Sequence, residues 1–119
     1  MITDRHLELI EKLKAKTLEK KTLWSKSSSQ DEFQIQLSRI SITIKYIRGS
    51  YNSVSTVNLS LYNDSGEKID SVDFEDNSTT YDDAFELFNA VKRTYYKVDE
   101  VMDQLLNEIE GDDVIGLPF

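Results

Sequence analysis

The spacing of apolar side chains predicts a long helix near each end of the chain. In residues 4–25, one set of side chains shares a face at helical spacing: Leu9, Ile10, Leu13, Thr17 and Trp24. Residues 81–109 carry a heptad series: Tyr81, Ala84, Phe88, Val91, Tyr95, Val98, Met102, Leu105 and Ile109. We expect one continuous helix over residues 81–109, whose stripe either packs in the domain core or forms an intermolecular coiled coil. Either Thr3 or Asp4 is expected to cap the first helix, and Thr80 the second.

Between the two helices the apolar pattern changes to a period of two, which is typical of strands. Residues 33–46 alternate with one change of parity at Ser38 and Arg39, which we interpret as a β-bulge within a single strand. A second strand is predicted over residues 57–62 and a third over residues 67–74. Residues 63–66, Asn-Asp-Ser-Gly, predict a hairpin between them because Asn and Gly tolerate positive φ.

These elements predict an α+β fold with a helix, a three-stranded antiparallel sheet and a long C-terminal helix. Both helices are expected on one sheet face, because the side chains of the other face are polar. We expect a single domain over residues 1–110 and a short tail over residues 111–119. The predicted core contains Leu13, Trp24, Ile42, Ile44, Leu59, Leu61, Phe88, Val91, Tyr95 and Val98.

Composition narrows the class of protein. The chain has 119 residues, is 39% hydrophobic and 30% charged, and contains no cysteine, so it offers neither a disulfide framework nor a thiolate metal site. No segment has the apolar length of a membrane helix, and the first residues lack the apolar segment of a signal peptide. We therefore expect a cytoplasmic protein.

Charge is distributed unevenly along the chain, whose formal net charge is −8. Residues 1–50 contain ten Lys or Arg and six Asp or Glu, whereas residues 51–119 contain four and sixteen. This asymmetry favours pairing of the basic first helix with later acidic segments, or head-to-tail association between copies. It argues against duplex DNA as a ligand and favours a protein partner with a basic surface.

The sequence offers little for catalysis. His6 is the one histidine, so with no cysteine there is no zinc signature and no second His or thiol for a nucleophilic site. The four glycines are scattered and form no phosphate-binding loop. We expect a protein that is not an enzyme and that uses no cofactor and no metal.

A run of acidic side chains without an intervening Lys or Arg is the first candidate binding surface. It consists of Asp70, Asp73, Glu75, Asp76, Asp82, Asp83 and Glu86. The run could imitate the phosphates of a nucleic acid, or it could be a solvated connection whose acids complement a helix dipole. Direct nucleic-acid binding by Lys92, Arg93, Tyr96 and Lys97 is not expected, because these cations lie in the acidic half of the chain.

The tail is the second candidate surface. Its partner-binding side chains would be Asp112, Asp113, Ile115, Leu117, Pro118 and Phe119. This segment resembles the acidic tip of bacterial single-stranded-DNA-binding proteins, in which the final Pro and Phe enter a pocket on replication and repair proteins. Its last five residues are also similar to a sliding-clamp-binding peptide, with Val114 in place of the usual leading Gln. The alternative is that the apolar tail folds back onto the domain.

The whole layout resembles that of small acidic inhibitors encoded by phages and mobile elements, including some anti-CRISPR proteins. The resemblance lies in architecture and composition. We therefore expect a non-enzymatic protein-binding module, an inhibitor or adaptor of such an element. Three alternatives remain open. The chain is an enzyme that uses only carboxylates, a replication-factor-docking protein that uses Leu117, Pro118 and Phe119, or a structural homo-oligomer, such as a homodimer, formed through the heptads.

Overall fold

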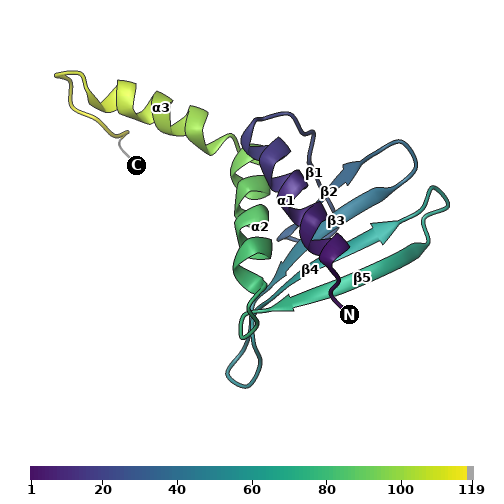
Figure 1. The fold of residues 1–119 in the computed structure, drawn as a ribbon. Coiled ribbons are helices and arrows are strands. Elements are labelled where there is room, and N and C mark those ends of the chain that lie inside the picture. The colour runs from purple at the N-terminus through teal and green to yellow at the C-terminus, as the bar shows by residue number, and fades with distance from the viewer. Residues whose placement is uncertain (118–119) are drawn as a thin grey trace.

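The computed structural model of the chain describes residues 1–117. The elements are α1 (Asp4–Leu18), β1 (Ser25–Lys26), β2 (Glu32–Gln36), β3 (Ser41–Ile47), β4 (Thr56–Tyr62), β5 (Lys68–Glu75), α2 (Tyr81–Tyr95) and α3 (Val98–Ile109). The protein is α+β, and its five strands form one antiparallel sheet in the order β1-β2-β3-β4-β5. Figure 1 shows α1 and α2 lying against the sheet, whereas α3 extends away from it.

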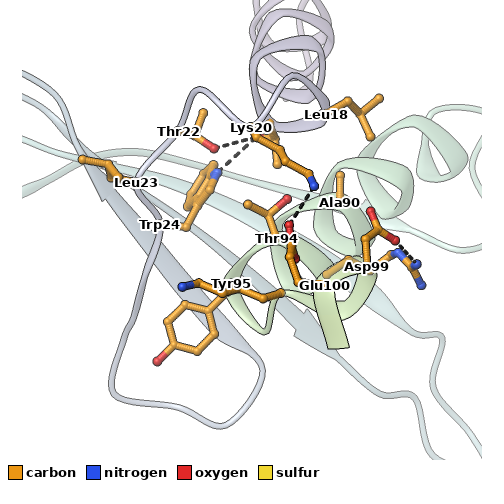
Figure 2. Close-up of a pocket in the computed structure, with 13 residues that line it drawn as sticks. Leu18, Lys20, Thr22, Leu23, Trp24, Ala90, Thr94, Tyr95, Asp99 and Glu100 are labelled. Carbon is orange, nitrogen blue, oxygen red and sulfur yellow. Dashed lines mark hydrogen bonds and ion pairs between the residues drawn. The ribbon is translucent and has the colours of Figure 1, made fainter. Parts of the chain in front are cut away.

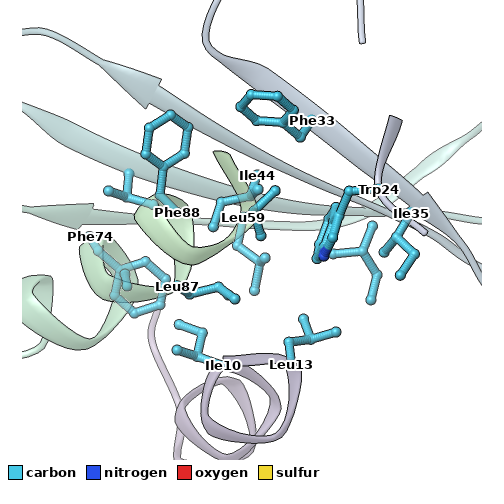
Figure 3. Packing of buried hydrophobic residues seen from close by; sticks show 14 of the residues in the cluster. Ile10, Leu13, Trp24, Phe33, Ile35, Ile44, Leu59, Phe74, Leu87 and Phe88 are labelled. Atoms are coloured by element: carbon cyan, nitrogen blue, oxygen red, sulfur yellow. The ribbon is translucent and has the colours of Figure 1, made fainter. Parts of the chain in front are cut away.

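The core lies between the sheet and the pair α1 and α2 (Figure 3). α1 contributes Ile10 and Leu13, and α2 contributes Leu87 and Phe88. Opposite them, Phe33 is fully buried, and its ring centroid lies 5.9 Å from that of Phe88. Burial of each large apolar side chain stabilises the fold by about 1.5–3 kcal/mol.

The prediction of three strands was wrong, because the segment predicted as one bulged strand forms two. β2 and β3 pair in a hairpin whose last register pair is Gln36 and Ser41. Residues 37–40 make the turn, in which the Leu37 amide donates to the Ile40 carbonyl at 2.8 Å. The change of parity at Ser38 and Arg39 therefore marks a reversal of the chain. It was not recognised because residues 37–40 contain no Gly, Pro or Asn.

The first helix is shorter than predicted. α1 ends at Leu18, and Lys20 then adopts a left-handed conformation with φ of 61°. Trp24 is buried as predicted, but from an extended segment, and its indole N–H donates to Thr17 Oγ1 at 3.1 Å. The following two residues form β1, a strand that was not predicted and that brings the total in the sheet to five. Trp24 fits the helical spacing of α1 although it lies outside the helix, so spacing alone overestimated the helix length.

The second predicted helix is interrupted. α2 ends at Tyr95 and α3 begins at Val98, with Lys97 left-handed at φ 54° and ψ 46° between them. Phe88 and Val91 are buried as predicted. Tyr95 is 37% exposed and Val98 lies outside the core cluster, so these two core assignments were wrong.

The remaining predicted core side chains lie in or beside the core. Leu61 is partly buried against the cluster, and five others are buried members of it: Leu13, Trp24, Ile42, Ile44 and Leu59.

Two local predictions from turn and capping chemistry are confirmed. The β4–β5 hairpin turns through residues 63–66, where Gly66 has φ of 80° and the Asn63 amide donates to the Glu67 carbonyl at 2.9 Å. Thr3 caps α1 in a capping box with His6. Thr80 precedes α2 as expected, but its side chain makes no capping hydrogen bond.

Candidate protein-binding surfaces

α3 carries an apolar stripe that nothing in residues 1–117 covers. None of its residues is buried. Five large apolar side chains are about half exposed: Val101 at 46%, Met102 at 49%, Leu105 at 45%, Leu106 at 52% and Ile109 at 54%. Because residues three and four apart share one helix face, these five side chains, here called the α3 stripe, form one surface. A helix of 12 residues is marginally stable in water without tertiary packing.

The charge around the α3 stripe has one sign. From residue 98 to residue 117 there is no Lys or Arg, and the acidic side chains are Asp99, Glu100, Asp103, Glu108, Glu110, Asp112 and Asp113. The first two of them are neutralised within the chain. The apolar stripe is therefore flanked by acids that carry no compensating cation on the same helix.

The first turn of α3 is held by two ion pairs from other elements. Arg93 Nη2 of α2 lies 2.9 Å from Asp99 Oδ1, and Lys20 Nζ lies 2.8 Å from Glu100 Oε1 (Figure 2). The hydrogen bond from Lys20 lowers the pKa of Glu100, and the same bond raises the pKa of Lys20. Both pairs are solvent-exposed, so each adds little to the stability of the fold. They connect the first turn of α3 to α2 and to the segment that follows α1.

A cavity of about 490 Å³ lies beside this junction. Figure 2 shows Trp24 and Thr22 on one side of it, Tyr95 and Thr94 of α2 on another, and Lys20 across it. Two apolar side chains of the lining are strongly exposed, Leu18 at 65% and Leu23 at 90%. The cavity thus combines an apolar lining with cations supplied by the ends of α1 and α2.

A second cavity of about 300 Å³ continues the first between α1 and α2. The two share Leu18, Ala90 and Arg93 and so adjoin each other, and the surface that they line together is here called the junction groove. Lys14 of α1 and Glu86 of α2 form an ion pair of 2.7 Å in the lining of the second cavity. Their hydrogen bond raises the pKa of Lys14.

The predicted acidic run is spread over several surfaces. Asp73 and Glu75 lie on the polar sheet face, opposite in parity to the buried Val72 and Phe74 of the same strand. Four of the seven acids bond within the chain: Asp70 with His6, Asp73 with Asn58, Asp76 with the Ser55 amide and Glu86 with Lys14. Asp82 and Asp83 lie in the first turn of α2. The fold therefore does not bring the run together as one continuous patch.

The tail is exposed wherever the structure describes it. Asp112 and Asp113 are exposed, and the apolar side chains Val114, Ile115 and Leu117 are 98%, 55% and 85% exposed. These three side chains do not fold back into the core. Pro118 and Phe119, the other two predicted docking residues, lie outside the described residues.

His6 has a partner that the sequence did not indicate. Its Nε2 lies 2.7 Å from Asp70 Oδ2 of β5, and its Nδ1 accepts from the Thr3 amide at 2.9 Å. The hydrogen bond from His6 lowers the pKa of Asp70. Thr3 Oγ1 also lies 2.9 Å from Nδ1, which aligns a hydroxyl, an imidazole and a carboxylate. Because both ring nitrogens are engaged in the helix cap and the sheet contact, this trio joins α1 to β5.

The basic and aromatic residues near the end of α2 are also engaged. Lys92 Nζ lies 3.3 Å from Asp31 Oδ1, and Arg93 pairs with Asp99. The Tyr95 ring contacts Phe33 at a centroid distance of 5.3 Å. Lys92 and Arg93 thus pair with carboxylates of the same chain.

The chain was compared with protein-family models, curated proteins and solved structures, and none of them matches it. Among residues 1–117, no three His, Cys, Asp or Glu side chains are grouped so that they could hold a metal ion. No helix in the same residues is long and apolar enough to cross a membrane.

The sequence pattern did not indicate the junction groove, and it identified only three of the five side chains of the α3 stripe. Val101 and Leu106 were left out because they flank the strict heptad positions. A wider helical stripe, with apolar side chains also at flanking positions, was the available signal. Leu18 and Leu23 could have been noticed, because they are apolar residues that lie outside the apolar face of the first predicted helix. Their exposure beside a cavity could not be read from spacing.

Proposed function

We propose that this chain is a non-catalytic protein-binding module, an adaptor or inhibitor, whose recognition element is α3. The observation that carries the proposal is the α3 stripe: five large apolar side chains on one helix, none of them buried. An amphipathic helix with an uncovered face is a common recognition element, because its apolar side chains enter a groove on the partner. The exposed stripe would otherwise be a liability for solubility.

Charge defines the partner. The acids that flank the stripe beyond its first turn, Asp103, Glu108, Glu110, Asp112 and Asp113, have no cation on α3 to compensate them. A partner with an apolar groove rimmed by Lys or Arg would match both the stripe and these acids. A groove rimmed by acids would be repelled.

A pair of matched variants tests the proposal. Leu105→Asp places a charge in the centre of the stripe, whereas Asn107→Asp makes the same charge change on the opposite side of α3. A partner captured from a bacterial lysate is purified and titrated against both variants. We expect Leu105→Asp to weaken binding by about 2 kcal/mol or more, as at an interface hot spot, and Asn107→Asp to bind like the wild type.

Equal binding of a captured partner by the wild type and Leu105→Asp would contradict the use of α3. Equal loss in both variants would indicate a general charge effect and not a contact with the stripe.

The exposed tail supports a second candidate, docking through residues 112–119. Among the described residues that follow α3 in the chain, Val114 and Leu117 are the most exposed large apolar side chains. A chain that ends at Asp113 keeps α3 intact and removes the apolar tail. Loss of partner binding in this truncated chain, with full binding by Leu105→Asp, would transfer the recognition role from α3 to the tail.

A further inference from the structure

The chain itself carries a groove of the kind that the α3 stripe requires. The junction groove has an apolar lining that includes Leu18, Leu23 and Ala90, and the two exposed leucines border it. Its charged lining residues are four cations, Lys14, Lys20, Arg93 and Lys97, and three acids, Glu86, Asp99 and Glu100. An uncovered apolar stripe and an unfilled apolar groove thus occur in the same molecule.

The α3 stripe does not reach the groove of its own chain. Two residues, Tyr96 and Lys97, separate α2 from α3, and the ion pairs of Asp99 and Glu100 hold the first turn of α3. Figure 1 shows α3 leaving the end of α2 and pointing away from α1 and the sheet. Filling its own groove would require α3 to reverse direction at Lys97 and to break both ion pairs.

We propose that the occupant of the junction groove is the α3 stripe of a second copy of this chain. In a two-fold symmetric pair each copy supplies one α3 and one groove, so both apolar surfaces are covered by the same operation. This inference rests on the proposed function, because it names the partner of the same helix.

Charge favours this partner over an unrelated acidic one. The distal half of α3 and the segment after it bring Asp103, Glu108, Glu110, Asp112 and Asp113, with no cation. The groove that would receive them carries an excess of one cation, and Lys97 makes no ion pair with any residue of 1–117. Lys14, Lys20 and Arg93 already pair with acids of their own chain, so the acids of one copy would meet Lys97 of the other.

The test is the mass in solution, measured by light scattering over a range of concentrations up to high micromolar. We expect the wild type to approach twice the 13.8 kDa of one chain. Leu105→Asp in the helix and Leu18→Asp in the groove should each raise the dimer dissociation constant by about thirtyfold or more. The matched controls Asn107→Asp and Ala15→Asp, both at exposed positions outside the stripe and the groove lining, should dimerise like the wild type.

Mixing the two weakened variants identifies the contact. Leu105→Asp keeps an intact groove and Leu18→Asp keeps an intact stripe, so the mixture can form one of the two contacts of the wild-type pair. We expect the mixture to show more dimer than either variant alone. Thermal melts of every variant in the monomeric range verify that each is folded, since all four positions are exposed.

Three results would overturn the inference. A wild type that remains monomeric at high micromolar concentration excludes the second copy, while the capture experiment with Leu105→Asp still decides the proposed function. A dimer that is lost in Leu105→Asp but retained in Leu18→Asp means that α3 pairs with α3. A dimer that is unaffected by both variants means that neither surface forms the interface.

Discussion

α2 and α3 continue the same heptad series, yet one half is buried and the other is not. In α2 the positions Ala84, Phe88 and Val91 are at most 2% exposed. In α3 the equivalent positions Met102, Leu105 and Ile109 are 45–54% exposed. The difference is in their surroundings, because α2 lies on the sheet and beside α1 whereas α3 extends beyond both (Figure 1). A heptad series therefore predicts an apolar face and does not identify what covers that face.

Truncation of one side chain in each half should give the largest contrast. Phe88→Ala removes a buried ring from the core and should cost about 3–5 kcal/mol of unfolding free energy. Leu105→Ala should change the unfolding free energy of the monomer by less than about 0.5 kcal/mol, because its side chain is about half exposed and does not pack against the core cluster. Urea melts at low protein concentration measure both values. Comparable losses in the two variants would mean that α3 packs within its own chain.

The break between the halves should respond to a change of backbone preference at Lys97. A left-handed conformation costs a non-glycine residue about 1–2 kcal/mol, and glycine avoids that cost while losing about 0.5–1 kcal/mol to backbone entropy. We expect Lys97→Gly to stabilise the protein by about 0.5–1 kcal/mol in urea melts. Lys97→Ala removes the same side chain and keeps the strain, so it should bring no gain. A similar effect of both variants would assign the change to the side chain.

The ion pair between Lys20 and Glu100 should give the smallest effect, with a defined pH window. Glu100 has a lowered pKa in the folded state, so its contribution is complete above its unfolded pKa and is lost as the pH falls through the folded value. Lys20 has a raised pKa, so its contribution is complete below its unfolded pKa and is lost as the pH rises through the folded value. The pair therefore supports the junction around neutral pH.

An NMR titration of the Glu100 carboxyl carbon measures this directly. In Lys20→Gln the pKa of Glu100 should rise toward its ordinary value, and in Lys20→Arg it should stay low because a cationic donor remains. An unchanged pKa in Lys20→Gln would show that the two side chains do not pair in solution. That result would remove one of the two ion pairs that connect the first turn of α3 to the rest of the domain.

The elements of this fold could be predicted where local chemistry decides them. The turn before Gly66 and the cap at Thr3 depend on residues that lie next to one another, and both were predicted correctly. The turn at residues 37–40 was missed, because the pairing of β2 with β3 places it and its own residues give no turn signal. Trp24 was assigned to a helix because its spacing matched the helical period. In the structure it is buried in the core and bonds to Thr17 from an extended segment.

The candidate site was harder to predict than the fold. No Gly or Pro lies at the break between α2 and α3 to indicate that the helix ends there. The spacing of apolar side chains also cannot predict that Lys97 adopts the left-handed conformation. The pairing of Asp70 with His6 joins residues that are 64 positions apart. Such contacts depend on how the sheet edge meets α1, which only the folded chain determines.

Hydrogen exchange of the backbone amides tests the central claim most directly, at a concentration where light scattering gives a monomer. The account predicts strong protection in α2, where exchange requires opening of the core, and little protection in α3, because a 12-residue helix without a packed face is marginally stable. Protection of α3 equal to that of α2 in the monomer would contradict the claim that the α3 stripe is left uncovered for a partner.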